Sequence, residues 1–203
     1  LRHGVHLSLH SATKGIAGHN DATLGVVSGE RDLIDSIWAY SVLHGATPSP
    51  FDALNALRGV RTLAVRTQHQ AASAQFLSES LQQHPGVSAV HYPGLATHPQ
   101  HDLAKRQMQH FGTVFAVELA GGIAAAEQLL ARVALVRVAT SLGGPETLVC
   151  HPATTTRDGS REAFRARRAN TVWVTSREAS GFPVTRQAVA HTRLQWRRTI
   201  SQP

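Results

Sequence analysis

Lys14 follows two hydroxyl-bearing residues, Ser11 and Thr13, in a stretch of small side chains. A lysine amine becomes a catalyst when it condenses with a carbonyl, and the usual carbonyl in enzymes is the aldehyde of pyridoxal phosphate (PLP). The hydroxyls of Ser11 and Thr13 are able to donate hydrogen bonds to a phosphate. Taken alone, the four-residue motif also fits a solvated surface lysine. The interpretation as a PLP site therefore depends on the rest of the chain.

The elements around Lys14 have a simple expected order. Apolar and polar residues alternate over 5–9, which predicts a strand that ends in the Lys14 loop. A second strand is predicted at 22–27, followed by a short helix at 31–38. The sequence thus predicts that a strand presents the lysine in a loop before the chain turns back.

One long helix is expected after the breaker cluster 45–50, from Pro50 to His84, with a bend or close-packing point at Gly59. Its expected apolar face comprises Leu54, Leu57, Leu63, Ala74, Leu77 and Leu81. Strands are then predicted at 87–92, 113–119 and 133–139, and helices at 101–110 and 123–131. This alternation of helices and strands predicts an α/β architecture.

Four segments carry a resemblance to a known family. They are HSATKGIAGHNDATLGVVSG (10–29), LHGATPSPFDALNALRGVRTLAVR (43–66), VHYPGLATHPQHDLAKRQM (90–108) and ATSLGGPETLVCHPATTT (139–156). In this order and spacing they resemble the Cys/Met metabolism family of PLP-dependent enzymes, which includes cystathionine synthases, cystathionine lyases and methionine lyases. The resemblance runs from about His6 to Thr156.

The resemblance implies the α/β fold of PLP-dependent transferases, fold type I. Residues 1–60 would be the C-terminal part of the large PLP-binding domain, and 61–156 part of the small C-terminal α/β domain. It also implies a PLP-dependent enzyme of transsulfuration, which forms or cleaves C–S bonds in substrates such as cystathionine, homoserine esters, cysteine or methionine. Members of the family are homo-oligomers, built as dimers of dimers.

The same resemblance implies roles for individual residues. Lys14 would bind PLP covalently and transfer protons during catalysis. Ser11 and Thr13 would hold the cofactor phosphate. Ser141, in a Ser-Leu-Gly-Gly stretch, would contact the substrate α-carboxylate.

Other residues of the resembling segments support or qualify these roles. His19 and Asp21 belong to a Gly-His-x-Asp signature and would support the lysine loop, a role close to that of an ordinary Asp turn. Gly15 stands where the family commonly has an aromatic residue. Thr140 stands where γ-type cystathionine enzymes often have a glutamate. The resemblance therefore leaves open whether the enzyme acts at the β or the γ carbon of its substrate.

The cysteine count and the hydropathy pattern limit the cellular compartment and the class of protein that fit this sequence. The chain has a single cysteine, Cys150, which excludes an internal disulfide framework and fits a reducing compartment. Although Cys150 is next to His151, we expect its side chain to be a small buried hydrophobe rather than a nucleophile. The chain has no apolar run of about 18 residues and no visible signal peptide. A cytoplasmic protein without membrane contact is therefore expected.

Histidines also raise the question of a metal site. His98, His101 and His110 lie close together in sequence, but no cysteine or carboxylate is placed to complete a tetrahedral ligand set. We therefore expect surface histidines and no metal.

The C-terminal tail differs in charge from the rest. Acidic and basic residues balance over 1–156, so the whole net charge of +7 falls within 157–203. One interpretation is a basic extension that binds nucleic acid, in a chain that is a non-catalytic remnant or interaction module. The other, which we favour, is a divergent, out-of-frame or disordered tail, with nucleic acid an unlikely partner.

Several parts of the family's PLP site match no segment of this chain. They are the phosphate-binding glycine loop, the aromatic residue that stacks on the ring, the aspartate at the pyridine nitrogen and the arginine that binds the substrate carboxylate. We therefore expect a partial chain that is impaired in turnover as written.

Overall fold

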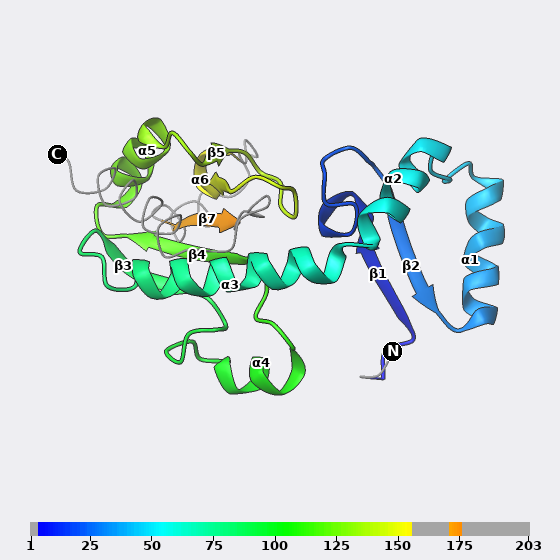
Figure 1. The fold of residues 1–203 in the computed structure, drawn as a ribbon, viewed down its shortest axis with the longest axis horizontal. Coiled ribbons are helices and arrows are strands. Elements are labelled where there is room, and N and C mark those ends of the chain that lie inside the picture. The colour runs from blue at the N-terminus through cyan, green and yellow to red at the C-terminus, as the bar shows by residue number, and fades with distance from the viewer. Residues whose placement is uncertain (1–3, 156–170, 176–203) are drawn as a thin grey trace. The chain divides into compact units, whose positions relative to one another are not determined.

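The computed structural model describes residues 4–155 and 171–175. The chain divides into two compact units, Leu1–Ala64 and Val65–Pro203 (Figure 1).

The first unit is built on a hairpin. Strand β1 (Leu7–Ser11) pairs antiparallel with β2 (Gly25–Gly29), so that Leu7 lies opposite Gly29 and Ser11 lies opposite Gly25. Between them the chain forms a π-helical turn, η1 (Ala12–Ile16), which contains Lys14. The predicted order of strand, lysine loop and strand is confirmed.

Two helices complete the first unit. Helix α1 (Arg31–Leu43) is longer than predicted and contains no buried residue. Helix α2 (Pro50–Val60) begins at Ser49, whose hydroxyl accepts a hydrogen bond from the Asp52 amide at 3.1 Å. Pro50 suits the first helical turn because its missing N–H has no partner there in any helix.

The single long helix predicted for 50–84 is wrong. The chain breaks after α2, and α3 (Leu63–Leu81) begins a separate helix. At the break, the Thr62 amide and hydroxyl both donate to the Gly59 carbonyl, at 3.2 and 3.3 Å. This tight turn replaces the hydrogen bonds that would have continued α2.

The expected apolar face is also wrong over α2. Leu54 and Leu57 are 60% and 55% exposed, whereas Ala56 and Gly59 are the buried residues of that helix. Over α3 three of the predicted residues are confirmed, because Ala74, Leu77 and Leu81 are buried in the core of the second unit.

The second unit contains a five-stranded sheet in the order β3-β4-β7-β6-β5. Its strands are β3 (Val87–His91), β4 (Val114–Leu119), β5 (Arg137–Val138), β6 (Leu148–Cys150) and β7 (Thr171–Thr175). All neighbours are antiparallel except β5 and β6. The strand predicted at 133–139 is thus reduced to two residues.

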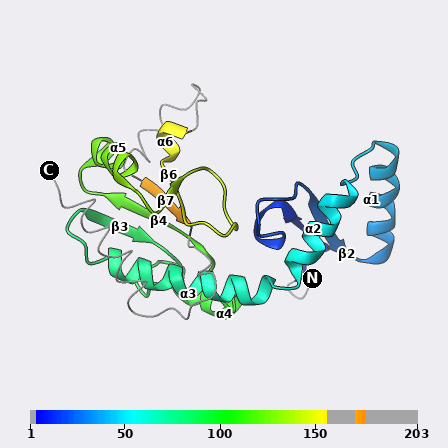
Figure 2. The same cartoon turned by 45° about the horizontal axis from the view of Figure 1, so that its top comes forward.

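Helices α4 (His101–Gln107), α5 (Gly122–Arg132) and α6 (Pro152–Thr155) complete this unit. Figures 1 and 2 show α3 running beside β3 and β4. Alternate residues of β4 are buried, and they share one apolar core with Ala74 and Leu77 of α3 and Leu129 of α5. The α/β architecture predicted from the sequence is confirmed.

Strand β7 corrects the prediction for the tail. It lies between β4 and β6, and its Val172 and Val174 are fully buried in the core. A divergent or disordered tail is therefore the wrong interpretation for 171–175. The other residues predicted to form that tail lie outside the described part of the chain.

Candidate functional site

Lys14 lies in a turn that is closed on both sides of it by backbone hydrogen bonds. The Ala17 amide donates to the Ala12 carbonyl, and the Gly18 amide donates to the carbonyl of Lys14 itself, both at 2.8 Å. Lys14 has φ −85° and ψ −127°, which is not helical, so the turn is kinked at this residue. Short π-helical segments of this kind are frequent at functional sites.

The Lys14 side chain is half-buried, and no described residue forms a hydrogen bond or ion pair with its amine. An amine without a carboxylate partner is available to react with a carbonyl. The turn therefore offers a nucleophilic nitrogen at the end of a strand.

The two predicted hydroxyls differ in their surroundings. Ser11 is exposed at the end of β1, and its side chain forms no capping hydrogen bond. The Thr13 hydroxyl accepts from the Leu24 amide at 2.9 Å and donates to the Leu24 carbonyl at 3.3 Å. Since a hydroxyl has one proton, Thr13 would have to release the Leu24 carbonyl to donate to a phosphate.

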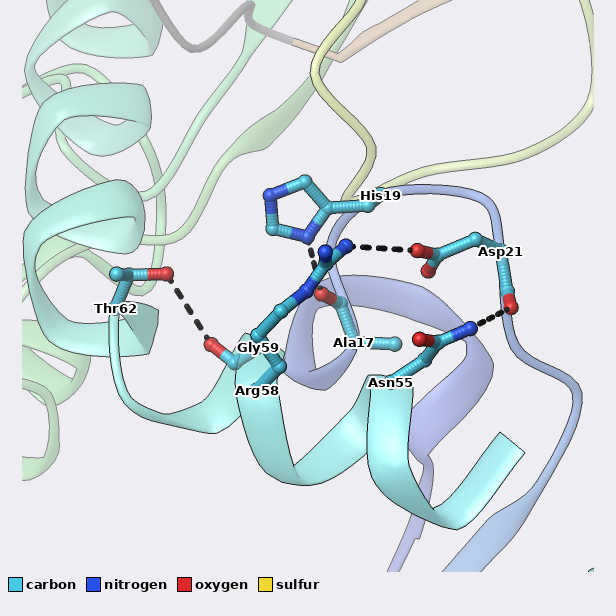
Figure 3. Close-up of polar contacts among 7 residues, drawn as sticks. All are labelled: Ala17, His19, Asp21, Asn55, Arg58, Gly59 and Thr62. Carbon is cyan, nitrogen blue, oxygen red and sulfur yellow. Dashed lines mark hydrogen bonds and ion pairs between the residues drawn. The ribbon is translucent and has the colours of Figure 1, made fainter. Parts of the chain in front are cut away.

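The Gly-His-x-Asp signature forms the turn after Lys14 (Figure 3). Gly18 and Asn20 have φ values of 75° and 59°, a region that favours glycine and tolerates asparagine. His19 Nδ1 lies 2.7 Å from the Ala17 carbonyl oxygen. The signature therefore turns the chain before Leu24, whose amide donates to the Thr13 hydroxyl.

Helix α2 holds the end of this turn through side chains that the sequence analysis did not single out. Asn55 donates to the Asp21 carbonyl at 2.9 Å, and Arg58 pairs with the Asp21 carboxylate at 3.1 Å. The Thr23 amide donates to Asp52 at 2.8 Å. No sequence motif links these positions, because they lie about 30 residues after the turn.

Asp52 also links the start of α2 to the turn. The hydrogen bonds from the Ser49 hydroxyl and the Thr23 amide hold the pKa of the Asp52 carboxyl below its ordinary value. Because both hydrogen bonds favour the ionised form, Asp52 remains a carboxylate while it accepts them.

Ser141 lies in the second unit, on the loop between β5 and β6, and is half-buried. The glycines after it are buried, and Gly143 has φ 79°. The buried Gln70 of α3 donates to the Gly144 carbonyl at 3.2 Å, which fixes the loop against that helix. Ser11, Thr13 and Lys14 therefore share one turn of the first unit, and Ser141 belongs to the second.

Cys150 is buried in β6, as predicted. Burial raises the pKa of its thiol, which lowers the fraction of reactive thiolate at neutral pH. The neighbouring His151 is also buried, with Nδ1 3.2 Å from the Thr154 hydroxyl. The two side chains are thus structural parts of the second unit.

The residues of the turn fit PLP in part. Lys14 offers an amine that no residue in the described part of the chain binds, and Ser11 offers an exposed hydroxyl three residues before it. Thr13 fits only if its hydroxyl proton changes partner. A lysine and a hydroxyl are the donor types that an aldehyde and a phosphate require.

Comparison with known families agrees with this chemistry. The family model described as Cys/Met metabolism PLP-dependent enzyme matches residues 1–172. The chain belongs to this family. The match reaches into β7, beyond the Thr156 limit expected from the four segments.

Individual relatives agree with the family match. The chain is 42% identical to an L-methionine gamma-lyase from Porphyromonas gingivalis and 40% identical to a cystathionine beta-lyase from Coxiella burnetii, over 77% and 81% of its length. The crystal structure of cystathionine gamma synthase from Xanthomonas oryzae pv. oryzae matches with a TM-score of 0.87 and 35% identity, over 98% of this chain and 50% of that one. The predicted fold of PLP-dependent transferases is confirmed.

The chain spans 40% and 43% of the lengths of the two lyases. In the described residues, no helix is both long and apolar enough to cross a membrane.

Proposed function

We propose that this chain contributes the cofactor lysine and the small domain of a PLP-dependent enzyme that forms or cleaves C–S bonds in sulfur-containing amino acids. The observation that carries this proposal is the amine of Lys14, which no described residue binds and which lies in a turn at the end of β1. The family membership supports the same chemistry.

When bound, PLP supplies an aldehyde that condenses with amines and a pyridinium ring that draws electrons from the substrate Cα. Lys14 would hold the cofactor through its Nζ, and the same amine, when free, would take and return a proton at the substrate Cα. The Ser11 hydroxyl would donate a hydrogen bond to the phosphate, and the Thr13 hydroxyl would do the same if it released its hydrogen bond to the Leu24 carbonyl.

Substrate recognition is assigned to the second unit. Ser141 contacts the α-carboxylate of the amino acid from a loop that Gln70 fixes at Gly144. Gly143 and Gly144, which follow Leu142, have no side chains that would keep a ligand from the backbone. The names of two relatives, methionine gamma-lyase and cystathionine beta-lyase, support a substrate among amino acids with sulfur in the side chain.

The domain division and assembly are part of the same proposal. Residues 1–60 belong to the large PLP-binding domain and 61–156 to the small domain. The active protein is a cytoplasmic homo-oligomer without a nucleic-acid partner. The apolar residues that α1 exposes, among them Trp38 at 63% and Leu43 at 84%, support burial against other protein surfaces.

The experiment that tests the cofactor assignment uses covalent trapping. The chain is incubated with PLP, reduced with borohydride and digested, and the labelled peptides are identified by mass spectrometry. We expect the label on Lys14 and little on Lys105, which is the only other lysine. Lys14→Arg should lose the label and Lys105→Arg should retain it, whereas equal labelling of both lysines in the parent chain would refute the assignment.

A further inference from the structure

Helix α2 packs against the lysine turn through a glycine. Gly59 and Ala56, three residues apart on one face of the helix, are its buried residues. A Cβ atom added to Gly59 would lie 2.1 Å from the Ala17 carbonyl oxygen and 2.7 Å from the Ala17 Cα. The backbones of α2 and the turn are therefore in direct contact, with no room for a side chain.

Ala17 transmits that contact to Lys14. It is fully buried, and its amide donates to the Ala12 carbonyl at 2.8 Å. The next amide, of Gly18, donates to the Lys14 carbonyl at the same distance. A displacement of Ala17 would thus change the hydrogen bonds on both sides of Lys14.

Polar contacts hold the same stretch of chain at a second point (Figure 3). Asn55 and Arg58 both reach Asp21, four residues after Ala17, through its carbonyl and its carboxylate. Asp21 is fixed by side chains that lie on the same helix as Gly59. The segment from Ala17 to Asp21 is therefore attached to α2 at both ends.

We propose that α2 is a positioning element for the Lys14 amine, in which Gly59 sets the approach of Ala17 and Asn55 holds Asp21. Gly59 and Asn55 do not touch the cofactor and act only through the backbone of the turn. This inference rests on the proposed function of Lys14. It adds that the reactivity of the amine depends on a helix that begins about 35 residues later in the chain.

The decisive variant is Gly59→Ala. Within a helix this change is normally stabilising, by removing the flexibility of glycine. Here the added methyl group must displace Ala17. A shift of about 1 Å in a reacting group can lower the rate of a reaction that depends on its position by a factor of about 100. We expect the ratio of PLP label on Lys14 to label on Lys105, after borohydride reduction, to fall about tenfold or more.

A second measurement follows the structural cause. Hydrogen exchange at the Ala17 and Gly18 amides should accelerate in Gly59→Ala, while the amides of β1 and β2 keep their protection. The matched control is Gly25→Ala, in the same unit, because its Cβ would meet only the His10 carbonyl oxygen at 3.8 Å. The control should leave the labelling ratio within about twofold of the parent.

The outcomes separate the two proposals. If Lys14 of the parent chain labels no better than Lys105, the cofactor assignment fails, and the exchange data alone decide whether α2 holds the turn. An unchanged labelling ratio and unchanged exchange in Gly59→Ala would overturn the positioning role. If Gly59→Ala unfolds the hairpin, Asn55→Ala decides instead: a several-fold lower ratio supports the role, and an unchanged ratio overturns it.

Discussion

At the scale of single residues, the hydroxyl of Thr13 has two competing uses. Its family role is to hold a phosphate, yet it spans the Leu24 amide and carbonyl across the hairpin. The position of Lys14 between hydroxyl residues was predictable from local spacing. The partner Leu24 was not, because a contact over eleven residues depends on the register of β1 and β2.

Thr13→Val should destabilise the first unit even without cofactor. The valine keeps the branched shape but leaves the Leu24 amide without its acceptor, which costs about 1–3 kcal/mol. Chemical denaturation and exchange of the Leu24 amide would measure this loss. Thr13→Ser should retain most of the stability. If Thr13→Val weakens PLP labelling but leaves the stability of the free chain unchanged, the bridge to Leu24 is unimportant.

The buried Tyr92 should make the stability of the native chain depend on pH. Burial raises the pKa of its phenol from 10.0 to about 12, and the hydroxyl donates to the Gly112 carbonyl at 3.0 Å. The unfolded chain loses this proton at lower pH than the native chain does, so stability falls as the pH rises above about 10 and stops falling above about 12. By pH 11 the loss is on the order of 1 kcal/mol relative to neutral pH.

Tyr92→Phe provides the measurement. At neutral pH the variant should be less stable than the parent, because it lacks the hydrogen bond to Gly112. Between pH 8 and 11 the difference in free energy of unfolding should shrink, since only the parent carries the titrating phenol. A difference that stays constant over this range would show that folding does not raise the pKa of Tyr92.

At the scale of elements, the sequence predicted the hairpin and strands β3 and β4, but not β6, β7 or the break between α2 and α3. Gly59 marked a bend or close-packing point, yet the pattern does not mark the turn at Thr62, which depends on its hydrogen bonds to Gly59. Strand β7 has the alternating β-branched pattern of a strand, Thr-Val-Trp-Val-Thr. The sequence did not predict this strand, because the arginine-rich residues around it favoured an irregular tail.

The central place of β7 predicts that the tail is needed for the stability of the second unit. A chain that ends at Thr155 would lose the strand that joins β4 to β6. We expect this truncated chain to be digested much faster across 65–155 than the parent. Val174→Ala in the full chain should cost about 2–3 kcal/mol, because it removes buried methyl groups and leaves a cavity. Equal protease resistance of the truncated chain would contradict the central role of β7.

At the scale of the whole molecule, the two units bury very different side chains. The described apolar residues that are buried in the first unit are all alanines, namely Ala12, Ala17, Ala22 and Ala56. The second unit buries a core of leucine, valine and aromatic residues. Alanine burial removes little apolar surface from water, so the first unit gains little stability from its own core.

This contrast predicts the behaviour of the 203-residue chain on its own. It should bind an apolar dye, hold PLP weakly and show no C–S lyase activity above that of free PLP, because a poorly held cofactor is close to one in water. Release of thiol and keto acid from cystathionine, cysteine or methionine is the assay. Supplying the N-terminal region of a relative should restore cofactor binding. Robust turnover by the chain alone would show that the first unit needs no such support.

The order of strands in the sheet also has a consequence during synthesis. The strand at its centre, β7, is the last of the described strands to leave the ribosome, after β3, β4, β5 and β6. Until then β4 and β6 each present an unpaired edge, and such edges invite pairing with other chains. The second unit therefore folds only after residue 175 has emerged, and the nascent chain passes through an interval in which chaperones would protect its two half-sheets.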